Sequence, residues 1–150
     1  MKVGFTGTEM GMTKLQFELL ETVLVLLKDV DEVHHGDCKG ADAQFHRLVC
    51  DKTKASIKIR PPINPRLRAY CAADEARGDY IFPEKEYIER NHDIVDSVGV
   101  LIAAPPSLTE TTRSGTWATV RYAIKEKTMV FVIYPNGTLE RKGEWVQSLL

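Results

Sequence analysis

A short stretch after an apolar run combines the residue types that bind phosphate. Residues 113–123 read R-S-G-T-W-A-T-V-R-Y-A and follow the apolar residues 98–104. A strand, a loop and a helix start would present backbone N–H groups and the positive end of the helix dipole. Gly115 would let a ligand approach the backbone, Thr116 would add a hydroxyl, and Arg113 would clamp a phosphate or carboxylate. An ordinary helix capped by its serine, with a solvated arginine, explains the same residues.

Two further glycine-rich turns follow expected strands. Residues 6–12 (T-G-T-E-M-G-M) suit a nest of backbone N–H groups that holds an anion. Residues 36–42 (G-D-C-K-G-A-D) end the second strand in a similar way. Both also suit plain strand–helix turns, and the first is not a complete G-x-G-x-x-G pattern. The residues of these turns that we expect to contact a ligand are Gly7, Thr8, Gly36, Asp37, Gly40, Ala41 and Asp42.

Asp42 lies near the start of the second expected helix, where its carboxylate has two potential roles. It would cap the helix, which is the common role of an aspartate at this place. It would otherwise accept hydrogen bonds from a ribose hydroxyl. The sequence leaves both roles open.

Four side chains raise the question of a metal site, namely His34, His35, Cys38 and His46. His34 and His35 are neighbours on an expected strand, so their side chains point to opposite faces. No pair among the four has the spacing of a closed structural zinc site. We therefore expect no metal ion and no cofactor.

Composition narrows the class of protein. The chain has 150 residues and a net charge of −1, which favours one domain and makes nucleic-acid binding an unfavoured role. No apolar run is long enough to span a bilayer, and the N-terminus lacks the apolar segment of a signal peptide. Three cysteines without a C-x-x-C pattern favour a reducing, cytoplasmic setting.

Strands alternate with helices along the chain, which predicts an α/β fold with a mainly parallel sheet and helices on both faces. Residues 1–134 should form one Rossmann-like domain, and residues 135–150 a tail. The simplest doubly wound order of five strands is 3-2-1-4-5. The expected strands are 2–5, 32–35, 56–60, 98–104 and 128–134, and the expected helices include 14–29, 84–95 and 115–125.

This order would bring the glycine-rich turns together. Ligands of open parallel sheets bind outside the carboxyl ends of the strands, where the strand order reverses. That point falls between the first and fourth strands, so the turns at 6–12 and 104–116 would meet there, flanked by 36–42. Residues 63–83 are mostly irregular, and a loop of this length could serve as a lid. Tyr80, Phe82 and Tyr87 would supply a stacking face for a base or pack at an edge.

The motifs resemble those of the SLOG superfamily, most closely its YspA/YpsA-like branch. They are more distantly similar to the DNA-processing protein DprA and to the Lonely Guy enzymes. The motifs are G-F-T-G-T, H-G-D-C-K-G-A-D, R-N and R-S-G-T-W-A-T, and they cover roughly residues 2–133. The resemblance implies a Rossmann-like fold that binds nucleotide-derived ligands. By position it implicates Gly7, Thr8, Gly36, Gly40, Ala41, Asp42, Arg90, Asn91, Ser114, Gly115 and Thr116.

One departure from the resemblance concerns catalysis. Lonely Guy phosphoribohydrolases carry glutamates directly after their G-T-x, whereas Ala118 and Thr119 follow here. N-glycosidic cleavage needs a group that activates water or stabilises the oxocarbenium-like charge. Glu110, Asp42 or Glu84 would have to substitute for the missing glutamates.

Three hypotheses therefore stand. The favoured one is a module that binds or senses a nucleotide-derived, phosphate-bearing small molecule, with Arg113 and Gly115 central to binding. The alternative is a nucleotide N-glycosidase or phosphoribohydrolase. The third is a scaffold or a single-stranded DNA binder. A homo-oligomer is also compatible with the tail, whose apolar residues would dock on the domain or on a second subunit. These residues are Trp145, Val146, Leu149 and Leu150.

Overall fold

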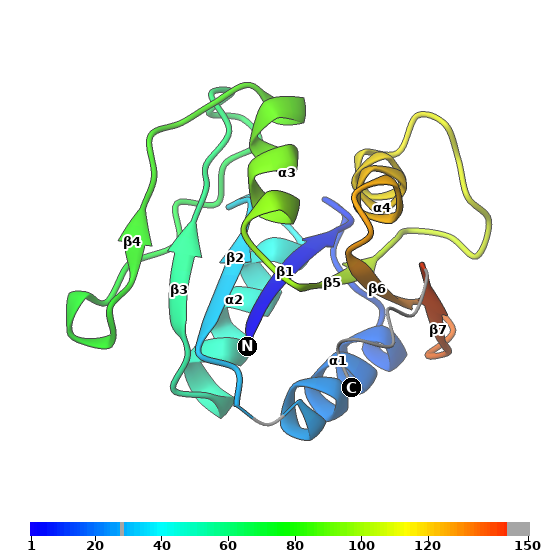
Figure 1. Ribbon diagram of the computed structural model, residues 1–150, viewed down its shortest axis with the longest axis horizontal. Coiled ribbons are helices and arrows are strands. Elements are labelled where there is room, and N and C mark those ends of the chain that lie inside the picture. Colours follow the sequence, from blue (N-terminus) through cyan, green and yellow to red (C-terminus); the bar gives the residue numbers. More distant parts are fainter. Residues whose placement is uncertain (28, 144–150) are drawn as a thin grey trace.

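The computed structural model describes residues 1–27 and 29–143, which form one open sheet covered by helices (Figure 1). None of the described helices is both long and apolar enough to cross a membrane. The strands are β1 (Lys2–Gly7), β2 (Glu32–His35), β3 (Ser56–Ile59), β4 (Tyr80–Ile81), β5 (Val100–Ala104), β6 (Met129–Ile133) and β7 (Leu139–Lys142). The helices are α1 (Lys14–Leu26), α2 (Ala41–Lys52), α3 (Tyr87–Asp96) and α4 (Gly115–Lys125), with the 3₁₀-helix η1 (Glu75–Arg77).

The sheet has the order β4-β3-β2-β1-β5-β6-β7. All neighbouring strands are parallel except β6 and β7, so the expected α/β class and mainly parallel sheet are confirmed. The five expected strands are β1, β2, β3, β5 and β6, and they follow one another in the expected order. The expectation of five strands is wrong, because β4 and β7 extend the two edges of the sheet.

Both added strands have weak sequence signals. β4 has two residues within 63–83, too few for a periodic pattern. β7 reads L-E-R-K, a charged sequence that suits an edge strand. A turn with Gly137 at φ +79° folds β7 back onto β6, so part of the expected tail belongs to the sheet. The tail residues Trp145, Val146, Leu149 and Leu150 lie outside the described residues.

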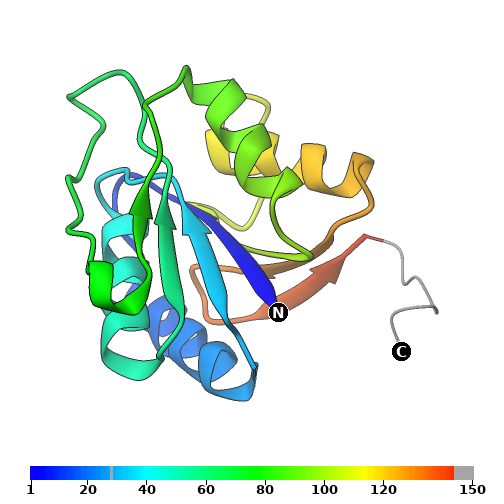
Figure 2. The same cartoon turned by 60° about the vertical axis from the view of Figure 1, so that its left-hand side comes forward.

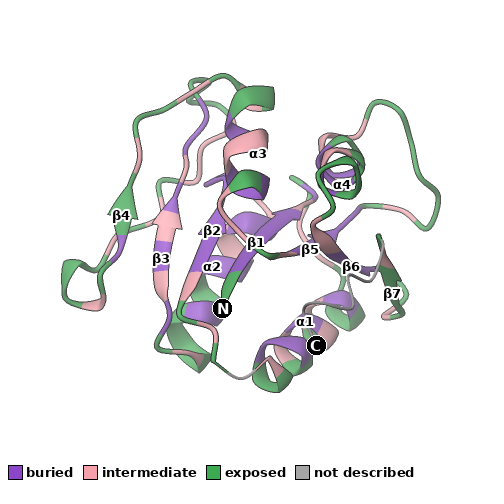
Figure 3. Ribbon diagram, viewed as in Figure 1, coloured by how far each residue is buried: buried purple, intermediate pink, exposed green. Residues whose placement is uncertain are grey.

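Helices cover both faces of the sheet. Figures 1 and 2 show α1 and α2 on one face and α3 and α4 on the other. Strand side chains alternate between the faces, so each face has its own apolar core. Phe5 stacks on Phe45 of α2 with ring centroids 4.4 Å apart, while Leu101 and Trp117 of α4 belong to the core cluster on the opposite face. Figure 3 shows the buried residues along the central strands and on the inner sides of the helices.

The start of α1 is tied to the carboxyl ends of two strands. Thr13 and Gln16 form a capping box, since Thr13 Oγ1 accepts from the N–H of Gln16 and Gln16 Oε1 accepts from the N–H of Thr13. The same glutamine side chain is 1% exposed. Its Nε2 donates to the carbonyls of Pro105 (2.9 Å) and Ile133 (2.7 Å). Gln16 therefore holds the first turn of α1 against the edge where a ligand site is expected.

Candidate functional site

Two adjoining cavities open at the carboxyl ends of β1 and β5. Their volumes are about 450 Å³ and about 270 Å³. Because they share five lining residues, they form one open space, which we call the crevice. The shared residues are Glu9, Tyr87, Arg113, Ser114 and Gly115.

The N-terminus of α4 forms one wall of the crevice. Ser114 is the N-cap residue, and its Oγ accepts from the N–H of Trp117 at 3.3 Å. The N–H groups of Gly115 and Thr116 have no acceptor within the helix, because they precede its first complete turn. Both residues, together with the exposed Arg113, line the smaller cavity. This wall thus combines free backbone donors, the positive helix end and a guanidinium group.

Gly115 is required by a neighbouring side chain. A Cβ atom at this position would lie 1.9 Å from the Tyr87 hydroxyl oxygen. Tyr87 is half-buried, and burial raises the pKa of its phenol. The glycine therefore makes room for the Tyr87 hydroxyl, which lines the crevice beside the helix N-terminus.

The second glycine-rich turn (36–42) is in contact with the first (6–12). The N–H of Ala41 donates to the Thr8 carbonyl at 2.9 Å, so protein already covers the N-terminus of α2. Gly40 has φ +87°, and a Cβ there would lie 2.3 Å from the Glu9 carbonyl oxygen. A Cβ on Gly7 would lie 2.5 Å from that of Ala41. Gly40 and Gly7 thus allow two loops to touch, while Gly7 and Thr8 also line the crevice.

Asp37 holds the long segment 63–83 against the end of β2. Its side chain is fully buried and its φ is +53°. One carboxylate oxygen accepts from the N–H of Cys71 at 2.9 Å, and the other from Arg68 Nε at 3.0 Å. The Asp37 carbonyl accepts from the N–H of Ala69 at 2.7 Å. The structure places Asp37 inside the protein as an anchor for residues 68–71.

Arg90 is a buried link between β2, β3 and α3. It is 2% exposed, and its donors contact the carbonyl of Gly36, the carbonyl of Arg60 (3.0 Å) and Asn91 Oδ1 (2.9 Å). A Cβ atom on Gly36 would lie 2.6 Å from the guanidinium carbon of Arg90, so the absence of a side chain at Gly36 makes room for Arg90. Arg90, Gly36 and Asn91 lie behind the crevice, although Asn91 borders a small cavity next to Tyr87.

Asp42 does not cap α2. The N-cap residue is Gly40, with no side-chain cap, and Asp42 Oδ2 accepts from the N–H of Cys38 at 3.1 Å. The other oxygen, Oδ1, is buried and has no hydrogen-bond partner among the described residues. Burial raises the pKa of Asp42 from 3.8 to about 6, against the lowering effect of Arg90. Asp42 is therefore an incompletely satisfied carboxyl group directly behind the first loop.

The carboxylate that lines the crevice is one that the sequence did not single out. Glu9 borders both cavities and follows Thr8 in the first loop. Of the proposed substitutes, Glu110 pairs with Arg121 at 2.9 Å and Glu84 lies 3.7 Å from Arg68. Neither borders the crevice. The position of Glu9, directly after the nest-like T-G-T, was the one sequence signal available.

The aromatic residues of the expected stacking face separate. Tyr80 and Phe82 pack edge to face at 4.8 Å between centroids, and the guanidinium of Arg60 lies 3.8 Å above the Phe82 ring. Only Tyr87 of the three borders the crevice among the described residues. Leu67 and Ile88 supply apolar wall beside it.

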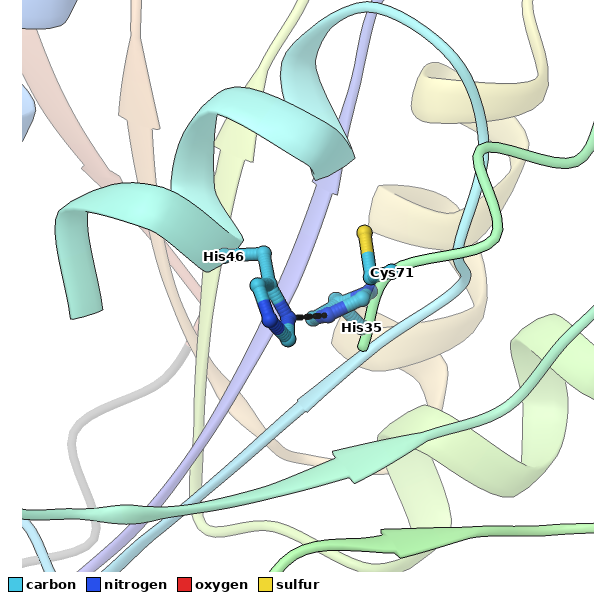
Figure 4. Close-up of side chains that lie close together, drawn as sticks. All are labelled: His35, His46 and Cys71. Carbon is cyan, nitrogen blue, oxygen red and sulfur yellow. Dashed lines mark hydrogen bonds between the residues drawn. The ribbon is translucent and has the colours of Figure 1, made fainter. Parts of the chain in front are cut away.

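His35, His46 and Cys71 meet in the interior, as Figure 4 shows. Their nearest ligand atoms lie within 4.8 Å of one another, and His35 Nε2 is 2.9 Å from His46 Nδ1. The N–H of Asp37 donates to His35 Nδ1 at 3.0 Å. In the neutral ring the proton therefore lies on Nε2, which donates to His46. A metal ion at His35 would need the Nε2 lone pair, which this hydrogen-bond pattern removes.

The pKa shifts of His35, His46 and Cys71 favour the uncharged form of all three side chains. Burial lowers the pKa of His35 well below its usual value and also lowers the pKa of His46. Burial and a hydrogen bond to Asp37 raise the pKa of the Cys71 thiol, which keeps its proton. The three side chains thus join β2, α2 and the segment 63–83. Their contact could not be predicted from the sequence, because it depends on the path of that segment.

The structure divides the expected site residues into two groups. Those that line the crevice are Gly7, Thr8, Arg113, Ser114, Gly115 and Thr116. Those that lie behind it and hold its loops are Gly36, Asp37, Gly40, Ala41, Asp42, Arg90 and Asn91.

Comparisons with models of known families, with curated proteins and with solved structures found no match for this chain. The SLOG resemblance therefore stays a prediction from the motifs.

Proposed function

We propose that this protein binds a nucleotide-derived, phosphate-bearing small molecule in the crevice. The single observation that carries the proposal is the wall formed by Arg113 and the N-terminus of α4. Free backbone donors, the helix dipole and an arginine together favour a phosphate group. A SLOG-like ligand-binding role is compatible with this arrangement.

The other residues that line the crevice suit the sugar and the base of such a ligand. Glu9 brings a carboxylate that would accept hydrogen bonds from sugar hydroxyl groups. Tyr87, Leu67 and Ile88 bring apolar surface against which a base would pack. Both Glu9 and Arg113 lack an ion-pair partner within the described part of the chain, so their charges are available to a ligand.

Calorimetry with a panel of nucleoside mono- and diphosphates, cyclic nucleotides and ADP-ribose tests the proposal. We expect at least one member to bind and Arg113→Ala to weaken it by about 10- to 100-fold, the range of a charge-assisted hydrogen bond. Lys125→Ala is the control, because it removes one positive charge from an exposed residue in the last turn of α4 that does not line the crevice. Silence across the panel, with no small molecule retained through purification, would contradict the proposal.

A second candidate function is hydrolysis of an N-glycosidic bond, and Glu9 is the observation in its favour. A carboxylate in the crevice could activate water or stabilise positive charge on the sugar. Chromatography of nucleoside monophosphates after incubation with the protein would reveal a released base. Glu9→Gln should abolish that release while the nucleotide still binds. If the parent protein releases no base, this candidate is excluded.

Partners and location are also proposals. We propose that the protein is cytoplasmic. We also propose that it has no nucleic-acid partner, since its net charge is −1. Retarded single-stranded DNA in a gel at low salt would contradict this. Size-exclusion chromatography with light scattering tests whether the protein forms a homo-oligomer, with which the apolar tail residues are compatible.

A further inference from the structure

A second cavity lies between α1 and α2, away from the crevice. Its volume is about 400 Å³, within the range of small-molecule sites. It shares no lining residue with the crevice. Gln44 Oε1 accepts from the N–H of Met12 at 2.8 Å, which joins the residue before the N-cap of α1 to the first turn of α2. The cavity is therefore formed by fixed elements and needs no rearrangement.

The floor of this cavity is apolar. Leu48 is 3% exposed and belongs to the core between the sheet and these two helices. Met12 and Phe17 are partly buried and pack against the same core. All three residues line the cavity. An alkyl or aryl group placed there would remove this apolar surface from water, which favours binding.

The rim of the cavity carries an unused positive charge. Arg47 is exposed and has no hydrogen bond or ion pair among the described residues. Lys14 is also at the rim, and its acidic partner Glu18 lies 3.9 Å away with both side chains exposed, so that pair is weak. Asp51 is the one acidic residue in the lining. Two cations and one anion leave the rim with a net charge of about +1.

We propose that this cavity binds a small amphipathic carboxylate. Its apolar part lies on Met12, Phe17 and Leu48, and its carboxylate is held by Arg47, which matches a carboxylate with two parallel N–H donors. Arg47 and Leu48 both line the cavity, so one ligand of modest length contacts both. Phosphate is a poorer match, because the first turn of α1 is already capped by Thr13.

Protein-observed NMR with octanoate as the probe tests this site. Octanoate should shift the amide resonances of Met12, Phe17 and Leu48 and leave those of Gly115 and Thr116 unchanged. We expect 1-octanol to bind about fivefold more weakly, because it lacks the charge that Arg47 pairs with. Acetate, which lacks the apolar part, should cause no saturable shift at the same concentration. Equal affinities for octanoate and octanol would overturn the proposal.

Three variants separate the role of Arg47 from general effects. Arg47→Gln should weaken octanoate binding about fivefold and leave octanol binding unchanged, which also shows that the cavity is intact. Lys52→Gln is the control, because it removes one positive charge from the same helix at a residue that does not line the cavity. Asp51→Asn should tighten octanoate binding by removing a like charge. Arg47→Gln binding octanoate as well as Lys52→Gln would refute the assignment.

Discussion

Replacement of Asp42 by asparagine should change how stability depends on pH. The Asp42 carboxyl group is 5% exposed, and its Oδ1 has no partner among the described residues. An asparagine would keep an oxygen to accept from the N–H of Cys38, so the loop geometry should persist. The variant would, however, remove the free energy that the buried negative charge costs near neutral pH.

The magnitude follows from the pKa of Asp42. Folding raises this pKa from 3.8 to about 6, so the folded protein binds the proton more tightly than the unfolded chain. Ionised Asp42 therefore destabilises the fold by about 3 kcal/mol at pH 7, about 1.5 kcal/mol at pH 5 and about 0.5 kcal/mol at pH 4. Asp42→Asn should accordingly gain about 2.5 kcal/mol of stability relative to the parent between pH 4 and pH 7.

Urea unfolding followed by circular dichroism at several pH values measures this difference. Any pH-independent change from the new amide cancels when the difference between variant and parent is compared across pH. Asp51→Asn, at the surface of the same helix, controls for the loss of one charge. A constant difference between Asp42→Asn and the parent from pH 7 to pH 4 would refute the raised pKa. An unchanged m-value would show that unfolding exposes the same amount of surface in both proteins.

Three further predictions concern the framework of the site. Gln16→Ala should destabilise the fold by about 2–4 kcal/mol, because two buried backbone carbonyls lose their donor; a loss below 1 kcal/mol in urea unfolding would contradict this role. Burial lowers the pKa values of His35 and His46 in the folded protein, so unfolding takes up protons below about pH 6.5. Stability should therefore fall as the pH falls from about 6.5, with a slope of at most about 1.4 kcal/mol per pH unit for each histidine. His46→Gln should make that slope shallower, and an unaltered slope between pH 6.5 and pH 5 would argue against it. Gly115→Ala should cost about 1–3 kcal/mol through overlap with the Tyr87 hydroxyl; the loss should vanish in a Tyr87→Ala background, as a double-mutant cycle would show.

The sequence alone determined the features that depend on local chemistry. Thr13 and Gln16 have capping-box spacing, and the box forms as expected. The alternation of apolar runs with helical patterns predicted the class of fold and the order of the five central strands. Residues 115–125 begin and end a helix as expected, because a serine cap and a helical apolar pattern are both local signals.

The tertiary structure decided what the glycines and charges do. A sequence motif cannot distinguish a glycine that makes room for a ligand from one that makes room for another part of the protein. Gly40 and Gly36 are of the second kind, because Glu9 and Arg90 occupy the space beside them. Edge strands β4 and β7 also required the fold, since a two-residue or strongly charged segment becomes a strand only when a partner edge is present.

Burial is the physical reason for the remaining differences. Arg90 was expected at the ligand from the resemblance, and Asp37 and Asp42 from their place in a glycine-rich turn. Arginine and aspartate are rarely buried unless they are paired, so nothing in the sequence indicated their burial. Their burial follows from the path of segment 63–83 and from the packing of α3, which are long-range contacts with no local signature. Glu9 illustrates the converse, since an unremarkable loop glutamate borders the crevice only because the ends of β1, β5 and α4 meet beside it.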